Sequence, residues 1–277
     1  MMENAVEQAI ENIRLKSKGE LSVVDCPVTI NFHPDRFTNQ NEPLLLAMQK
    51  AGHLQSQFET GTSNGGLTAY AGGERWLWEQ RVFDGAYDNA ANALRPKYGA
   101  LNFRKYEFGA SPRFGSAYFQ LKPHILTRTT FCYPDSYFEP EDFAVFSHVQ
   151  SLIDKATVAS EDLLDDYIEA HIHGEISLQD DVECVVLDPI YRGTEIELQA
   201  NALGVPVKWH QGFSLSIEVM KQYPDYRGQQ FIEVAKQFVE NGKVNAKIVG
   251  EAVTKLDYDE QDIKKIWHYL ARFGYPS

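Results

Sequence analysis

The sequence is short of basic residues. Lysine and arginine together number 26, against 39 aspartates and glutamates, so the formal net charge is −13. An acidic surface repels the phosphates of a nucleic acid, and we therefore expect no nucleic-acid partner. Cysteine is equally scarce: only Cys26, Cys132 and Cys184 are present, at wide spacings. Without a CxxC pair a zinc ribbon is excluded, and three free thiols are predicted.

Long apolar runs are missing as well. No segment approaches 18 consecutive apolar residues, and residues 1–20 lack the apolar core of a secretory signal. We therefore expect no contact with a membrane and a cytoplasmic location. Delivery into a host cytosol as a secreted virulence effector or toxin stays open, because other export signals can lie in ordinary-looking termini.

Several motifs of known chemistry are also absent. The glycine-rich segment 61–66, GTSNGG, is not GxGxxG and does not open a helix after a strand, which excludes a Rossmann dinucleotide site. GxxxxGKS/T and HExxH do not occur, which excludes a P-loop and a zincin metal site. Residues 61–65 match the letters of GxSxG, but they do not open a helix directly after a strand, as a serine-hydrolase elbow does.

The sequence does contain segments in which apolar and polar residues alternate. Residues 28–36, 112–122 and 167–174 alternate apolar and polar side chains, as strands with one apolar face do. Their polar faces present His33, then Ser116 with Tyr118, then Glu169. Polar groups buried without partners are costly, so we expect these faces to meet water or a ligand in one shared cleft. Three ordinary solvent faces of antiparallel strands are the alternative.

The periodicity divides the chain into three parts. Residues 1–20 have the pattern of an amphipathic helix, residues 21–214 are rich in strands, and residues 215–277 show helical spacing. A short helix is predicted at 43–51, and Gly52 is expected to end it. Further helices are predicted at 229–241 and 259–273. The fold class is therefore α+β, with an N-terminal helix and a helical C-terminal extension that we expect to recognise a target.

Eight segments of the sequence indicate a family resemblance when they are taken together, although each alone is a weak indication. They read NFHPDR (31–36), GTSNGG (61–66), RPKYGALNF (95–103), PRFGSAYF (112–119), RTTF (128–131), DYIEAHIHG (166–174), DDVECVVLDPIYRGT (180–194) and WHQGF (209–213). Together they resemble an uncharacterised bacterial and fungal family that is similar to effector-like and toxin-like mono-ADP-ribosyltransferases. The shared pattern covers about two thirds of the chain.

The resemblance implies an ADP-ribosyltransferase-like mixed sheet as the core of the fold and NAD as co-substrate. Such enzymes cleave NAD, release nicotinamide and transfer ADP-ribose to a protein acceptor. They hold NAD with a His or Arg on an early strand and a Ser or Tyr motif on a middle strand, and a Glu on a later strand is catalytic. By resemblance these positions are His33, Ser116 and Glu169, with Arg36 as the alternative to His33.

The resemblance also implies a wider set of NAD contacts. These are His33, Arg36, Gly61, Thr62, Ser63, Asn64, Arg113, Phe114, Gly115, Ser116 and Tyr118. Arginine is the favoured acceptor, but arginine-modifying enzymes often carry Glu or Gln two positions before the catalytic Glu, where this chain has Tyr167. The acceptor residue is therefore open.

One carboxylate is sufficient for this chemistry. Nicotinamide leaves NAD as a neutral base and needs no proton, and the transition state is oxocarbenium-like. A carboxylate at Glu169 would stabilise the developing positive charge without a metal. Two alternatives stay open. One is a zinc-dependent hydrolase that uses Glu169, His171 and His173, with His33 and His210 as further ligands; the other is a non-catalytic NAD-binding module.

Overall fold

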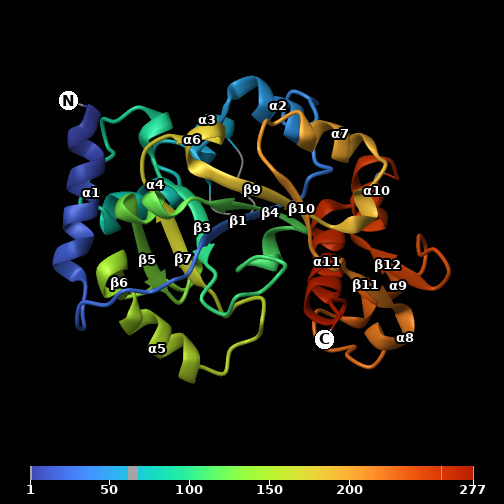
Figure 1. Ribbon diagram of the computed structural model, residues 1–277. Helices are drawn as coiled ribbons and strands as arrows, with labels where there is room; N and C mark the ends of the chain where they lie inside the picture. Colours follow the sequence, from blue (N-terminus) through green and yellow to red (C-terminus); the bar gives the residue numbers. More distant parts are fainter. Residues whose placement is uncertain (1, 62–67, 257, 277) are drawn as a thin grey trace.

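The computed structural model describes residues 2–61, 68–256 and 258–276. Its centre is an eight-stranded mixed sheet in the order β10-β9-β4-β1-β3-β7-β5-β6 (Figure 1). The strands are β1 Val28–Phe32, β3 Lys97–Leu101, β4 Ala117–Leu121, β5 Thr129–Tyr133, β6 Asp142–Val145, β7 Ile168–Ile172, β9 Val182–Leu187 and β10 Val207–Trp209. Neighbours are antiparallel except β9 and β10, which are parallel. The predicted α+β class with a mixed sheet is confirmed.

The helices lie around this sheet. They are α1 Met2–Lys16, α2 Leu44–Ala51, α3 Gln57–Thr60, α4 Glu74–Val82, α5 Gln150–Val158, α6 Leu178–Asp181, α7 Glu195–Asn201, α8 Ile217–Met220, α9 Gln229–Ala235, α10 Ala246–Thr254 and α11 Glu260–Phe273. Two small sheets pair β2 His53–Leu54 with β8 Ile176–Ser177 and β11 Ser214–Ser216 with β12 Lys243–Asn245. Gly52 ends α2 in the left-handed conformation, as predicted.

One face of the large sheet is apolar, because the alternating residues of every strand point the same way. Residues that pair across neighbouring strands share a face, so Ile30 of β1 lies with Phe119 of β4 and Val185 of β9. This face forms the main hydrophobic core together with side chains of α2, α5 and α7. The predicted apolar sides of the three motif strands are therefore confirmed.

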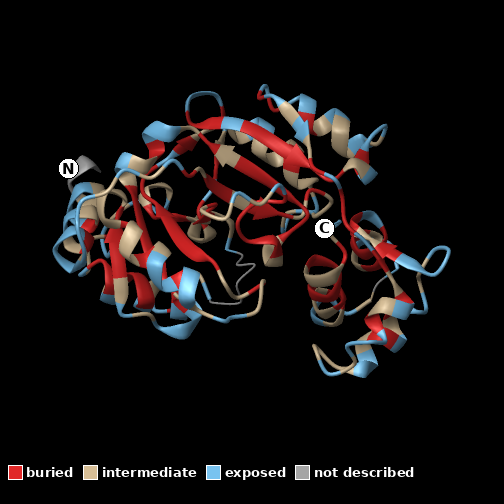
Figure 2. Ribbon diagram, turned by 60° about the horizontal axis from the view of Figure 1, so that its bottom comes forward, coloured by how far each residue is buried: buried red, intermediate tan, exposed pale blue. Residues whose placement is uncertain are grey.

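The opposite face carries the polar residues, and it is also largely covered. Helices α1 and α4 pack over the β5–β6 end with a second apolar cluster that includes Ile13, Trp78 and Phe143. Figure 2 shows the strands of the sheet buried along most of their length. Polar side chains on this face must therefore find partners within the protein or in a ligand.

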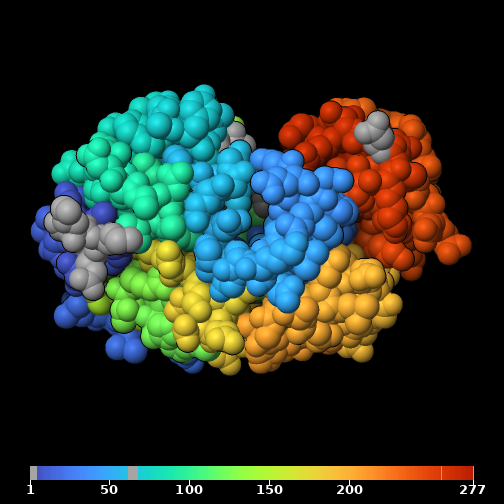
Figure 3. Space-filling model, turned by 90° about the horizontal axis from the view of Figure 1, so that it is seen from above, coloured from blue at the N-terminus to red at the C-terminus, as the bar shows by residue number. Residues whose placement is uncertain are grey.

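The C-terminal elements form a third packed unit at the other end of the sheet (Figure 1). Its core joins Leu215, Ile266 and Leu270 to Phe108 and Tyr191, which belong to the preceding part of the chain. Seen from above, the surface is hollowed between the teal lobe that contains α4 and the red C-terminal helices (Figure 3). In the described part of the chain, no helix combines the length and apolarity needed to span a membrane.

Candidate active site

Glu169 lies in the middle of β7, between Ala100 of β3 and Cys132 of β5. Only 6% of it is exposed. Its two carboxylate oxygens have separate partners: His171 Nε2 is 3.1 Å from Oε1, and the Ser136 hydroxyl donates to Oε2 at 3.0 Å. Ser136 begins the short 3-10 turn Ser136–Phe138, just after β5. The predicted catalytic residue is thus a buried, fully hydrogen-bonded carboxylate.

Arg75 of α4 completes this cluster. Its Nη1 donates to the Ser136 hydroxyl at 3.0 Å, and its guanidinium lies 4.0 Å from the centre of the Tyr98 ring. Burial acts to raise the pKa of Glu169, but the His171 hydrogen bond, the Arg75 charge and the Ser136 hydrogen bond outweigh it, and the net shift is downward. Glu169 is therefore ionised beside a buried cation.

A chain of hydrogen bonds leads from Tyr87 to Glu169. Tyr87 Oη is 2.6 Å from His173 Nδ1, and His173 Nε2 is 2.9 Å from Thr130 Oγ1. Thr130 Oγ1 is in turn 3.2 Å from Nδ1 of His171. Burial lowers the pKa of both histidines, so both rings are neutral. The distances alone leave the positions of the protons open.

The charge on Glu169 fixes the direction of this chain. An ionised carboxylate can only accept, so His171 donates from Nε2 and accepts at Nδ1. The Thr130 hydroxyl then donates to His171, accepts from His173 Nε2, and leaves His173 Nδ1 to accept from Tyr87. Every link has one donor and one acceptor. The chain, which we call the Tyr87–Glu169 relay, holds Glu169 in one orientation and one charge state.

The polar face of β7 was expected to meet water or a ligand, but the structure covers it with side chains of the protein. The His171 ring packs 5.1 Å from Trp78 and 5.7 Å from Phe83, and His173 is fully buried. The alternative of a solvent face fails for the same reason. The cost of burial is offset because each polar group on this strand found a side-chain partner.

His33 and Ser116 lie together at another part of the same face. His33 follows β1 directly and Ser116 precedes β4 directly, and the adjoining residues Phe32 and Ala117 pair across the two strands. The His33 ring meets Trp267 of α11 edge-on at 4.8 Å. The structure therefore brings two of the three predicted motif residues together, against the C-terminal region.

Glu169 stands apart from that pair. Its neighbour Ala100 is level with Thr29 of β1, and His33 lies four residues further along. Strand geometry then separates Glu169 from His33 by about 16 Å. Between them, Ala110 N donates to Thr29 Oγ1 at 2.9 Å, so the segment after β3 covers this stretch of the face. A ligand that touches both residues must be extended.

Most of the other predicted NAD contacts surround His33. Arg113 forms an ion pair with Asp165, and Arg36 Nη1 is 3.8 Å from Glu260 Oε1. Phe114 packs edge-on against Tyr167 at 5.8 Å. The two arginines thus stand beside His33 with surface carboxylates as their present partners.

Gly115 is constrained by close packing. Its φ is +152°, and a Cβ added there would lie 2.0 Å from the Phe32 carbonyl carbon, so only glycine fits between the two strands. Gly61 ends α3 in the left-handed conformation and is exposed. Thr62, Ser63 and Asn64 lie outside the described residues.

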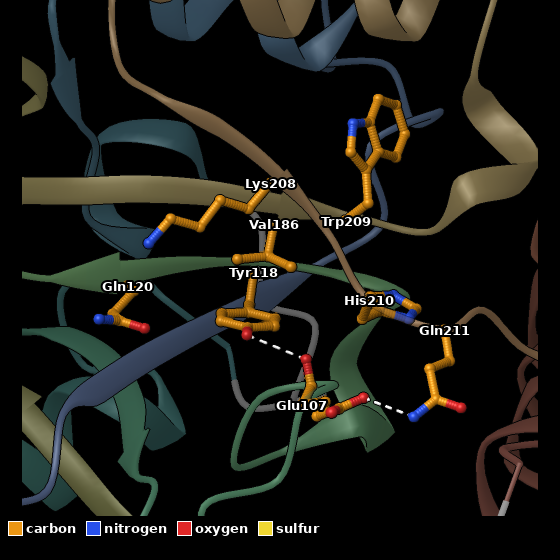
Figure 4. Close-up of a pocket in the computed structure, with 8 residues that line it drawn as sticks. All are labelled: Glu107, Tyr118, Gln120, Val186, Lys208, Trp209, His210 and Gln211. Atoms are coloured by element: carbon orange, nitrogen blue, oxygen red, sulfur yellow. Dashed lines mark hydrogen bonds between the residues drawn. The ribbon is translucent and has the colours of Figure 1, made fainter.

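Tyr118 lies on the same strand face as Ser116 and lines two shallow surface hollows. One hollow, of about 390 Å³, also contains Trp209 and Lys208, and the Tyr118 hydroxyl donates to the Glu107 carbonyl at 2.9 Å (Figure 4). The second hollow, of about 300 Å³, shares Tyr118 and Gln120 with the first. Neither hollow is lined by Glu169 or His33.

The donors of the zinc alternative are arranged differently from the prediction. Sγ of Cys132, a carboxylate oxygen of Glu169 and a ring nitrogen of His171 lie within 4.8 Å of one another. His173 is not in this group, and both its nitrogens are hydrogen-bonded within the relay. His210 is bonded to the Ser116 carbonyl at 2.7 Å. The nearby Arg75 charge also opposes a second cation.

Comparison with protein families gives a match over most of the chain. Residues 27–153 and 144–273 match the model of a family described as a protein of unknown function, DUF3626. The curated proteins contain no match to this sequence. The family description assigns no activity, so the resemblance to ADP-ribosyltransferases stays a prediction.

Proposed function

The chain belongs to the DUF3626 family, and we propose that it is an NAD-cleaving mono-ADP-ribosyltransferase with Glu169 as its catalytic carboxylate. The observation that carries the proposal is the state of Glu169. It is an ionised carboxylate held by directional donors on the same sheet face as His33 and Ser116. A protein side chain, with arginine favoured, would accept the ADP-ribose.

The chemistry needs one fixed negative charge. The bond between the ribose C1′ and the nicotinamide nitrogen breaks, and the electron pair leaves with neutral nicotinamide. The ribose carbon becomes positively charged until the acceptor attacks it and loses a proton. A carboxylate that is already ionised and oriented stabilises this charge without reorganising. The relay and Arg75 would keep Glu169 in that state.

Ser136 suggests how the ribose reaches this group. Its hydroxyl occupies one carboxylate oxygen of Glu169, as a ribose hydroxyl would. The turn that carries it is exposed at Tyr137 and Phe138. In the proposed reaction this turn moves and a ribose hydroxyl replaces that of Ser136. The diphosphate and adenosine would then extend toward His33 over the segment after β3, which covers the polar face between the two residues.

The test is Glu169→Gln, which keeps the size of the side chain and removes its charge. We expect NAD affinity close to normal, because ribose hydroxyls can still bind an amide. Turnover should fall at least about 10²–10³-fold, the effect of removing comparable preorganised groups. Cleavage of NAD and transfer of a label from NAD to proteins of a cell lysate are measured together, and intact mass identifies the modified protein.

Glu183→Gln is the matched control, because Glu183 is an exposed residue of β9. Since Glu169→Gln removes one of the two carboxylate charges that act on Arg75, folding is checked by circular dichroism and Glu169→Asp is made alongside. The aspartate keeps the charge, so it should keep the fold and part of the turnover. Wild-type turnover in folded Glu169→Gln, or loss of turnover in Glu183→Gln, would show that the catalytic residue is wrongly assigned.

A further inference from the structure

Helix α11 packs directly on the segment that carries Arg113. Trp267 Nε1 donates to the carbonyls of Pro112 and Arg113 at 2.9 and 3.1 Å, and the same side chain meets His33. His268 follows Trp267 on the helix, and Lys264 lies one turn before it. Residues from the two ends of the chain therefore meet at one junction.

His268 has an unusual environment. It is 1% exposed, and neither ring nitrogen has a hydrogen-bond partner. Nearby, Arg36 Nη1 and Arg227 Nε are also buried donors without a hydrogen-bond acceptor. Leaving a buried polar group unpaired is unfavourable, so such groups in native proteins usually indicate a missing partner. Here most of the unpaired atoms are N–H donors, which require an acceptor.

Several cations surround His268. Burial and the charges of Arg113, Arg227, Lys265 and Lys264 together lower its pKa to about 2. Burial and the charges of Arg113 and Lys265 also lower the pKa of Lys264, against the opposite effect of Glu260. This cluster is conspicuous in a chain whose formal net charge is −13.

Two carboxylates compete with a ligand for these cations. Asp165 pairs with Arg113 and is 3.9 Å from Arg227 Nη2, and Glu260 is 3.8 Å from Arg36. The side chains of Arg36, Arg113 and Arg227 are partly exposed, at 19–25% of their surface. Arg113 and Arg227 lie near enough to the buried His268 ring for their charges to act on it, and Arg36 lies against Glu260 of the same helix.

We propose that this junction binds a diphosphate, with Arg36, Arg113 and Lys264 at the rim and an N–H of neutral His268 beneath it. A diphosphate supplies acceptor oxygens for the unpaired atoms of His268 and Arg36, and negative charge for the cations around them. The site itself follows from the donor set. Its identification as the position of the NAD diphosphate rests on the proposed function. The C-terminal helix then belongs to the ligand site and not only to target recognition.

The experiment is calorimetric titration of the full chain with inorganic pyrophosphate. We expect His268→Phe to weaken binding about 10-fold or more, because a charge-assisted hydrogen bond is lost. The same variant, without ligand, should melt at an unchanged or higher temperature, because a phenyl ring replaces two unpaired nitrogens. Lys264→Gln should also weaken binding about 10-fold. Lys221→Gln, which removes an exposed lysine paired with Glu218, should change affinity less than about twofold.

The proposal is overturned if millimolar pyrophosphate does not bind, or if Lys264→Gln and folded His268→Phe bind it as tightly as the native chain. Lys264→Gln keeps the test decisive should His268→Phe fail to fold. Pyrophosphate requires no NAD cleavage, so the outcome does not depend on catalysis. Binding without NAD turnover would refute the proposed function alone. NAD turnover with normal NAD affinity in both variants would refute the diphosphate site alone.

Discussion

Thr130 is the residue of the Tyr87–Glu169 relay for which the effect of a substitution on stability can be calculated most directly. Its hydroxyl accepts from His173 and donates to His171, both fully buried. Thr130→Val keeps the shape of the side chain but leaves an N–H of His173 without an acceptor and Nδ1 of His171 without a donor. Each unsatisfied group costs about 1–3 kcal/mol, so the free energy of unfolding should fall by roughly 2–6 kcal/mol.

The neighbouring threonine is an internal control. Thr129 is equally buried but lies on the apolar face, where its hydroxyl makes one bond, to the Ile125 carbonyl at 2.8 Å. Thr129→Val should therefore cost about 1 kcal/mol. Thr130→Ser restores the hydroxyl and should recover most of the loss. Denaturant unfolding followed by circular dichroism measures all three variants. The relay would be disproved if Thr130→Val cost no more than Thr129→Val, or if serine failed to restore stability.

Two further predictions concern metal and pH. NAD cleavage should be unaffected by a chelator, because one ionised carboxylate is sufficient; loss of activity that added zinc restores would favour a metal at Cys132, Glu169 and His171. His268 has a pKa of about 2 in the folded protein and its ordinary value of 6.5 when unfolded. Above pH 6.5 His268 is neutral in both the folded and the unfolded chain. Below pH 6.5 only the unfolded chain binds the proton, which favours unfolding. Between pH 6 and 5 the native chain should therefore lose up to about 1.4 kcal/mol of stability per pH unit relative to His268→Phe. Parallel stability curves for the two proteins over that range would contradict a buried neutral His268.

Local patterns in the sequence predicted the strands well. The alternation in residues 28–36 and 112–122 placed Phe32 and Phe119 on the core face, because side-chain direction in a strand depends only on position. The stop at Gly52 is similarly local. The resemblance also directed attention to Glu169, although its role in catalysis stays a prediction.

The partners of Glu169 could not be predicted in this way. Arg75 comes from a helix whose sequence resembles any charged surface helix, and Ser136 comes from a turn after another strand. Only the pairing order of the sheet and the packing of α1 and α4 bring them to β7. The environment of His268 could not be predicted for the same reason, because the sequence of an amphipathic helix does not show which residues pack against its histidine. The junction with Arg113 arises from contacts between distant segments.

The contact between His33 and Trp267 also bears on biosynthesis. His33 is translated about 230 residues before Trp267. At about 5–20 residues per second, roughly 10–50 seconds pass between them. During that time the early strands exist without the helix that faces them, and the cationic junction cannot assemble. A nascent or C-terminally truncated chain would lack this site. The proposed diphosphate site would therefore form only after α11 has been synthesised.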